Sequence, residues 1–133
     1  MPPRPLPNSI EIGIVTTNMT EMRHFYGDTL GLKYQSELSF PGGVMHRYHL
    51  ENSIIKLVSY DTPPAIEVIA GGGLAAKGYR YISMGMEGIS AWFAELETMG
   101  VSIPVHVTPF ADGIGFGFIA DPDGNWIEVF GTL

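Results

Sequence analysis

Hydrophobic and polar residues alternate along several short stretches of the chain, and each such stretch predicts a strand with one buried face. The first reads Ile-Glu-Ile-Gly-Ile-Val over residues 10–15, so its isoleucines share one face while Glu11 and Gly13 share the other. A helical pattern follows, whose apolar positions recur at intervals of three and four before Gly31. Glycine at that point is typical of a helix C-terminus. The chain therefore opens with a strand and a helix.

Three more strand-like stretches complete the first half, at about residues 32–38, 44–50 and 54–60. Prolines and glycines then interrupt the pattern over residues 61–78. This composition predicts a linker, with one helical turn around Ile66.

The second half repeats the order of the first. A strand at about 79–84 precedes a helix at 89–99, which ends at Gly100, and three more strands follow near 101–108, 115–120 and 126–130. Asp121-Pro122-Asp123-Gly124 predicts a tight hairpin turn before the last strand. When the halves are aligned, Glu11 falls on Tyr81 and Lys56 falls on Glu128. We interpret the chain as a duplicated β-α-β-β-β unit, because each half alone would expose an apolar sheet face.

Composition narrows the class of protein. The chain has 133 residues, of which 45% are hydrophobic, which suits one domain with a closed core. Its net charge of −7 argues against nucleic acid and anionic membranes as partners. It has no cysteine, which excludes disulfides and sulfur-ligated zinc. Residues 1–9 hold four prolines and no apolar core of a signal peptide, so we expect a mobile tail on a soluble, cytoplasmic domain.

Two motifs carry a family resemblance. Residues 24–32 read His-Phe-Tyr-Gly-Asp-Thr-Leu-Gly-Leu, and residues 121–129 read Asp-Pro-Asp-Gly-Asn-Trp-Ile-Glu-Val. In this order, within a duplicated frame, they resemble the vicinal oxygen chelate superfamily, which contains glyoxalase I, extradiol dioxygenases, fosfomycin-resistance proteins and bleomycin-binding proteins. The resemblance covers nearly all of residues 10–130.

The resemblance implies an α+β fold. Two tandem βαβββ modules, at about residues 10–60 and 79–131, would form curled mixed sheets that together make a cup, with the helices outside. We therefore expect one domain of this type over residues 10–133. The family also implies a homodimer, since its members with one pair of repeats often form one.

The resemblance places metal ligands on the first and last strands of each half, at the positions of Glu11, Lys56, Tyr81 and Glu128. Alternation independently puts these four side chains on the face opposite the helices. Lys56 departs from the family pattern, because an ammonium within about 4 Å of a divalent cation costs several kcal/mol. We infer that Lys56 replaces the metal charge, and we predict neither a metal ion nor another cofactor.

Two carboxylates, an amine and a phenol can perform proton chemistry. Glu11 or Glu128 would be the base, its partner or Tyr81 the acid, and Lys56 would hold negative charge that develops on an oxygen. This set predicts an isomerase, lyase or cyclase that acts on a small oxygenated substrate. In the alternative interpretation, the same residues form a structural ion-pair network.

Aromatic side chains are predicted to line the substrate side of the second half: Phe116, Phe118, Trp126 and Phe130. They favour a hydrophobic or aromatic substrate. An alternative places the two phenylalanines in the core beneath a helix.

Three residues of the first half are further candidates for substrate binding, namely His46, Tyr48 and His49. Which of them line the cup depends on the turn after residue 50. A turn of two residues places Arg47 and His49 beside Lys56, whereas a turn of three places His46 and Tyr48 there.

Two other functions remain open at this point. The chain could sequester a small molecule without converting it, as bleomycin-binding proteins do. It could also be a metalloenzyme that uses Glu11, Glu128 and a histidine from the second strand of the first half, although Lys56 argues against this.

Overall fold

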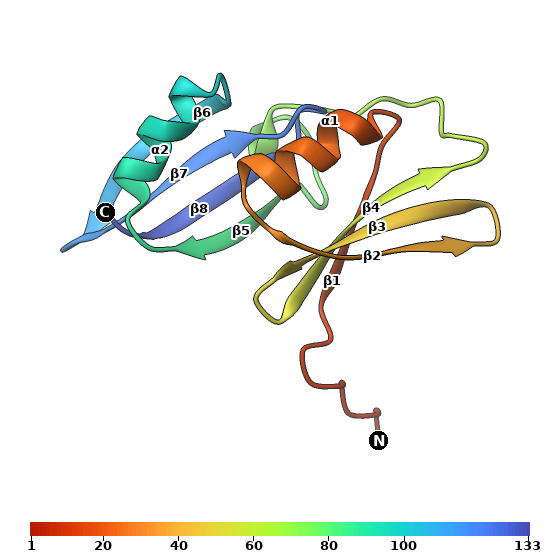
Figure 1. Ribbon diagram of the computed structural model, residues 1–133. Helices are drawn as coiled ribbons and strands as arrows, with labels where there is room; N and C mark the ends of the chain where they lie inside the picture. The colour runs from red at the N-terminus through yellow and green to blue at the C-terminus, as the bar shows by residue number, and fades with distance from the viewer. The chain divides into compact units, whose positions relative to one another are not determined.

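The computed structural model describes residues 1–133 and contains two four-stranded β-sheets with short helices (Figure 1). The chain divides into two compact units, Met1–Ile66 and Glu67–Leu133. Each unit contains a strand, a helix and three further strands in that order. The α+β fold of two tandem βαβββ sets that the sequence predicts is thus confirmed.

The first unit forms one mixed sheet in the order β1-β4-β3-β2, with β1 parallel to β4 and the other pairs antiparallel. Its elements are β1 (Glu11–Val15), α1 (Met19–Arg23), the π-helix η1 (His24–Thr29), β2 (Lys33–Phe40), β3 (Gly43–Leu50) and β4 (Ser53–Tyr60). The apolar side of the helical segment buries Met22, Phe25 and Tyr26, and the sheet buries Ile55 and Leu57.

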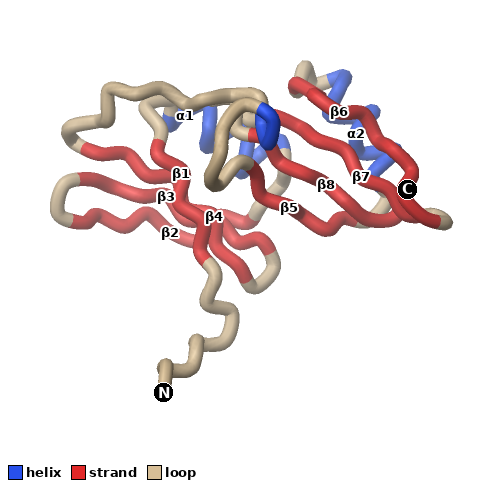
Figure 2. Tube along the Cα trace, turned by 180° about the vertical axis from the view of Figure 1, so that it is seen from behind, coloured by secondary structure: helices blue, strands red, loops and turns tan.

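The second unit repeats this topology, with sheet order β5-β8-β7-β6 and β5 parallel to β8 (Figure 2). Its elements are η2 (Gly72–Leu74), β5 (Tyr81–Met86), α2 (Ile89–Thr98), β6 (Ser102–Ala111), β7 (Ile114–Ala120) and β8 (Trp126–Thr132). Helix α2 buries Ile89, Phe93 and Leu96, at the three- and four-residue spacing of an amphipathic helix.

Two local expectations are corrected. The helical turn expected around Ile66 is wrong: that segment has no helix, and the only turn of 3₁₀-helix in the linker is η2. Instead, Arg80 holds the linker by donating from Nε to the carbonyl of Gly72 at 2.8 Å and from Nη2 to that of Ile69 at 2.5 Å. The first helix, expected to be regular, widens into a π-helix, with Leu30 N–H donating to the carbonyl of Phe25 at 2.8 Å.

The turn before β8 forms as expected and fixes where that strand begins. The buried Asp121 carboxylate accepts hydrogen bonds from the backbone N–H groups of Asp123 at 3.0 Å and Asn125 at 2.9 Å. Gly124 adopts a positive φ of 93°, which a residue with a side chain rarely adopts. The turn thereby sets the register of Glu128 in β8.

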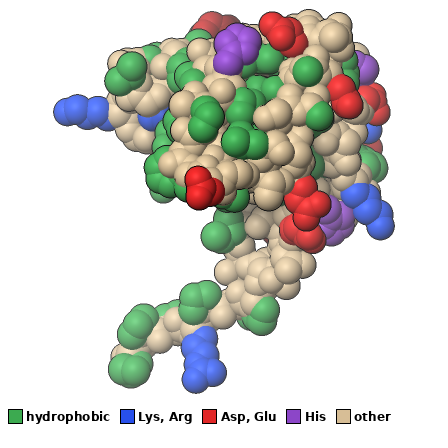
Figure 3. Space-filling view, turned by 90° about the vertical axis from the view of Figure 1, so that its left-hand side faces the viewer, with side chains coloured by type: hydrophobic (Ala, Val, Ile, Leu, Met, Phe, Trp, Pro, Cys, Tyr) green, Lys and Arg blue, Asp and Glu red, His purple; other side chains and the backbone are tan.

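Residues 1–9 are exposed and extend away from β1 (Figures 1 and 3). Their side chains are mostly apolar in Figure 3, and Arg4 supplies their one positive side-chain charge. None of the helices of the protein has the length and apolar character needed to cross a membrane.

Candidate functional site on the open sheet faces

The turn between β3 and β4 decides which residues of the first unit lie beside Lys56. Leu50 pairs with Ser53, so the turn has two residues, and Glu51 adopts a positive φ of 49° within it. In this register Arg47 lies directly opposite Lys56. The two-residue alternative in the sequence analysis is therefore the observed one, and both side chains lie on the sheet face opposite α1.

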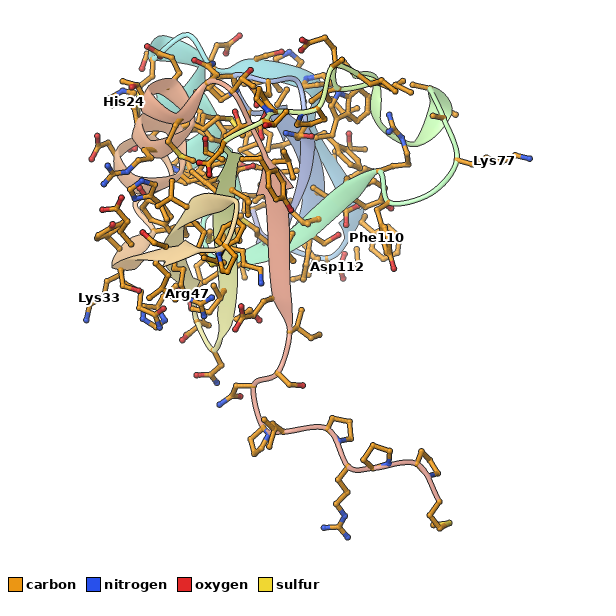
Figure 4. All side chains as sticks on the ribbon, turned by 90° about the vertical axis from the view of Figure 1, so that its right-hand side faces the viewer. His24, Lys33, Arg47, Lys77, Phe110 and Asp112 are labelled. Carbon is orange, nitrogen blue, oxygen red and sulfur yellow. The ribbon has the colours of Figure 1, made fainter.

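Glu11, Arg47 and Lys56 form an ion cluster on this open face. Arg47 donates from Nη1 and Nη2 to the two carboxylate oxygens of Glu11, at 2.8 and 3.0 Å, and Lys56 Nζ lies 3.3 Å from Oε1 of Glu11. Arg47 Nε donates to Gln35 at 2.7 Å, which fixes the guanidinium. Figure 4 labels Arg47 on this sheet. The Arg47 hydrogen bonds, aided by Lys56, lower the pKa of Glu11 to about 2, so Glu11 is ionised and is a weak base.

This cluster does not fit a divalent metal ion. Both oxygens of Glu11 already accept hydrogen bonds from Arg47, and two cations face a single carboxylate. A metal ion at Glu11 would meet net positive charge, which is unfavourable at such distances. No three His, Asp or Glu side chains of the protein gather into a group that could hold one.

His46 and Tyr48 lie on the opposite face of the same sheet, so the alternative with a three-residue turn, which would place them beside Lys56, is not the one that forms. Alternation along β3 separates them from Arg47, and both are buried. His49 does share the face of Glu11, since the two residues pair with the same residue of β4, Ile54. Of the three candidates in β3, only His49 has the expected orientation.

His46 is held in place by its neighbours on the helix side. Its Nδ1 and the Tyr34 hydroxyl are hydrogen-bonded at 3.0 Å, and its Nε2 lies 3.9 Å from Glu37. Burial, together with the positive charge of Arg23, lowers the pKa of His46, while Glu37 opposes this shift. His46 is therefore held on the helix side of the sheet, away from Lys56.

The second unit places Tyr81, Ser83 and Glu128 on its open face. Strands β5 and β8 pair in parallel, with Ser83 opposite Glu128 and Tyr81 opposite Trp126. Ser83 donates from Oγ to Oε1 of Glu128 at 2.7 Å. Glu128 thus lacks a cationic partner but is oriented by one hydroxyl.

Sequence reasoning missed Ser83. The signal was present, because Ser83 lies two residues after Tyr81 in the same strand and so faces the same way. Its partner across the sheet, however, follows only from the parallel register of β5 and β8.

Aromatic rings continue this face on both sides of Glu128. Phe118 contacts Tyr81, Trp126 and Phe116, with ring centroids 5.2, 5.4 and 6.5 Å apart. Gly117 faces the other way, where a Cβ would come within 2.6 Å of the Phe93 ring of α2. The two phenylalanines are therefore not beneath the helix, and the alternative core interpretation is wrong.

A groove with a volume of about 360 Å³ adjoins Glu128 where β7 begins beside the second half of β8. Phe110, Ile114, Phe116 and Phe130 supply apolar walls. Figure 4 labels Phe110 with Asp112, which lies in the β6–β7 turn. Phe110 and Ile114 were not expected from the sequence, although Ile114 lies two residues before Phe116 in β7 and so faces the same way.

The groove and the rings give the carboxylate an apolar setting. A planar molecule with an oxygen or nitrogen function could stack on the rings and direct its polar group toward Glu128. Within the second unit, one base, one phenol and one hydroxyl are available for proton transfer or for orienting a ligand.

Sequence comparison relates the chain to one family and one curated relative. The family model described as glyoxalase/bleomycin resistance protein/dioxygenase superfamily matches residues 9–129. Protein YwbC of Bacillus subtilis (strain 168), itself uncharacterized, is 27% identical over 124 residues, which cover 89% of this chain and 92% of YwbC.

Solved structures of similar fold include a glyoxalase family protein from Bacillus cereus, with a TM-score of 0.83 and 18% identity, covering 100% of this chain and 99% of that one. The antibiotic-binding protein TnmS3 from Streptomyces sp. CB03234 has a TM-score of 0.66 and 16% identity, covering 92% of this chain and 93% of that one. At these identities the structural likeness establishes the fold alone.

Proposed function

The chain belongs to the glyoxalase/bleomycin resistance protein/dioxygenase superfamily, and from this premise we propose that it is a small-molecule enzyme that uses general acid/base chemistry without a metal ion. The observation that carries the proposal is Glu128, a carboxylate oriented by Ser83 among aromatic rings and beside an apolar groove.

Glu128 is the better base of the two glutamates. The pKa of Glu11, lowered to about 2 by Arg47 and Lys56, makes that carboxylate a poor proton acceptor. Glu128 has one hydrogen bond from a neutral hydroxyl, on Oε1, and no ion pair, so its Oε2 is available to a substrate. Ser83 then acts as a positioning residue.

Tyr81 is the proposed acid, because its phenol shares the face of Glu128 and its ring packs against Phe118. Lys56, whose Nζ lies 3.3 Å from Oε1 of Glu11, is proposed to keep that carboxylate ionised within the first unit. Glu11 would orient Lys56 and Arg47 rather than exchange protons. In this account the proton leaves a carbon next to a carbonyl, goes to Glu128, and is returned at another atom.

The aromatic face and the groove favour a flat, hydrophobic substrate with one or two oxygen functions. Isomerisation, elimination and cyclisation of such molecules all begin with this proton abstraction. Family members bind small molecules, which supports the substrate class only in this coarse form. We further propose that residues 10–133 act as one domain in a cytoplasmic homodimer, with residues 1–9 as a mobile tail.

Hydrogen exchange at carbon tests the proposal without knowledge of the final product. Aromatic ketones and aryl 2-oxo acids are incubated with the protein in D₂O, and the loss of the proton next to the carbonyl is followed by NMR. We expect catalysed exchange that Glu128→Gln lowers by about 100-fold or more, since general base catalysis contributes on that scale. Ser83→Ala should lower it by a smaller factor.

Glu67→Gln, in the exposed linker, is the matched control and should leave the exchange rate unchanged. Exchange should also persist after treatment with a chelator. Full exchange in Glu128→Gln would refute the role of the base. Loss of exchange on chelation, restored by a divalent metal, would refute metal independence.

A second candidate function is sequestration of a small molecule. The aromatic rings that contact Phe118 favour it, because they provide a binding surface that needs no chemistry. A solved structure with the same fold is described as an antibiotic-binding protein. Recovery of an unchanged aromatic ligand after incubation with stoichiometric protein, together with no exchange in D₂O, would favour this function over the enzyme.

A further inference from the structure

A second pocket lies on the helix side of the first unit, on the opposite face of the sheet from the ion cluster. It is an open pocket with a volume of about 720 Å³, lined by residues of α1, η1, β2 and β3. Its polar lining includes Thr20, Arg23, His24 and Asp28, and its apolar lining includes Met19 and Leu32. The proposed function uses none of these residues.

Arg23 is an exposed residue whose guanidinium makes two contacts with the tyrosines that line this pocket. Its Nε donates to the Tyr48 hydroxyl at 3.2 Å, and its guanidinium carbon lies 5.1 Å from the centre of the Tyr34 ring. Tyr48 is 3% exposed, so the hydrogen bond ties the guanidinium to the core of the unit. Two independent contacts thus hold one cation.

The far end of the guanidinium is left for a ligand. Its terminal nitrogens, Nη1 and Nη2, donate to no protein acceptor, although Glu37 contributes a favourable longer-range charge. The Tyr48 hydrogen bond also raises the pKa of Arg23, so the group is charged at any physiological pH. Arginine in this arrangement matches the two oxygens of an oxyanion, and little side-chain entropy remains to be lost.

The supports of Arg23 are themselves fixed. The Tyr34 hydroxyl is hydrogen-bonded to the buried His46 at 3.0 Å, and the rings of Tyr34 and Tyr48 contact each other at a centroid distance of 5.2 Å. The π-helix brings Gly27 against Tyr48, where a Cβ would approach the ring to 3.1 Å. Insertion of a π-helical turn is a recurrent feature of functional sites.

We propose that this pocket binds the carboxylate of a small organic monoanion, with Arg23 as the residue that holds it. Met19, Leu32, Tyr34 and Tyr48 offer apolar surface to the rest of the molecule. Asp28, hydrogen-bonded to His24 at 3.0 Å, also lines the pocket and disfavours a second negative charge. Together with the net charge of −7, Asp28 selects a monocarboxylate over a phosphate dianion.

Titration of the full chain with benzoate tests the proposal, with NMR shifts of the residue 19–34 amides as the readout. Benzamide, the neutral analogue, and inorganic phosphate are the comparison ligands. We expect benzoate to shift these amides and to bind at least about tenfold more tightly than either comparison ligand, since a charge-assisted pair contributes on that scale. Arg23→Gln should lower the affinity for benzoate by about tenfold or more.

Lys33→Gln is the matched control, because it removes the same charge from the same unit but does not line the pocket. It should change benzoate affinity by less than about twofold. Tyr48→Phe keeps the ring and removes the hydroxyl that fixes Arg23. It should therefore lower the affinity for benzoate, while an unchanged circular dichroism spectrum shows that the fold is intact. If Arg23→Gln disturbs the fold, Arg23→Lys provides the same test, since it keeps the charge and loses the paired donors.

Absence of amide shifts with benzoate, equal binding of benzamide, or tighter binding of phosphate would each overturn the proposal. So would unchanged benzoate affinity in Arg23→Gln. The deuterium-exchange test of Glu128 concerns the other unit, and so the two proposals can fail separately.

Discussion

At the scale of single residues, the chemistry of the open faces follows from which partner each carboxylate has. Glu11 faces two cations and is fixed as an anion, whereas Glu128 faces a hydroxyl and aromatic rings. Although the two glutamates lie on corresponding open faces of their units, their surroundings suit opposite roles. One is a structural counter-ion and the other is a candidate base.

Glu11→Gln should destabilise the protein at neutral pH and alter its acid unfolding. Because the folded-state pKa of Glu11 is about 2 against an ordinary value of 4.5, the ion cluster stabilises the fold above about pH 4.5 and loses this effect as pH falls toward 2. Glu11 is partly exposed, so we expect a loss of about 1 kcal/mol at neutral pH, seen as a lower Tm.

The Tm difference between wild type and Glu11→Gln should shrink as pH falls from 4.5 toward 2, and in about 1 M NaCl at neutral pH. Glu67→Gln serves as the control with the same charge change. A Tm difference that is the same at every pH would contradict the assignment of the stabilisation to the Glu11 charge.

At the scale of elements, glycines in β7 decide which face of the second sheet receives the helix. Gly115 and Gly117 are buried, and Gly117 lies directly beneath Phe93 of α2. The phenylalanines between and after them therefore project to the open face. The alternation of glycine and phenylalanine thus packs the helix on one side and forms the aromatic surface on the other.

Gly117→Ala should lower the free energy of unfolding by about 1–3 kcal/mol, because the added methyl would lie 2.6 Å from the Phe93 ring and 3.0 Å from the carbonyl oxygen of Val105. Denaturant unfolding measures the change. Gly73→Ala is the matched control: it has open space and no positive φ, so it should be neutral or slightly stabilising.

Phe93→Leu combined with Gly117→Ala should recover part of the loss, since a smaller side chain leaves room for the methyl. If Gly117→Ala and the wild type had the same denaturant midpoint of unfolding, the close contact between α2 and this strand would be contradicted.

At the scale of the whole molecule, charge limits the partners. Acidic residues number 14 against 7 basic ones, and four of those basic residues already bind groups of the protein: Arg23, Arg47, Lys56 and Arg80. The remaining cations do not add up to a surface that would attract a polyanion. Both proposed sites instead suit small ligands.

The protein should not be retained on heparin at an ionic strength of about 0.15 M, because its long-range field is negative. Its solubility should be lowest near pH 4.9, where the net charge vanishes. Column retention that requires added salt for elution would reveal a basic surface, against this expectation.

Much of the fold was determined by the sequence alone. Period-two alternation, glycine at helix ends and the Asp-Pro-Asp-Gly turn are local properties, so they indicated the repeated βαβββ order and the open-face orientation of Glu11, Lys56, Tyr81 and Glu128. Where the signal was weak, as around Ile66 in the proline- and glycine-rich linker, the expectation failed.

Only the tertiary structure decided the partners of those residues. Arg47 reaches Glu11 because a two-residue turn sets the register of β3, and Ser83 reaches Glu128 because β5 and β8 pair in parallel. The Arg23 pocket likewise needs a π-helix packed on a particular sheet face. Alternation fixes the face that a side chain occupies, but contacts between strands distant in sequence depend on strand order and register, which no local pattern contains.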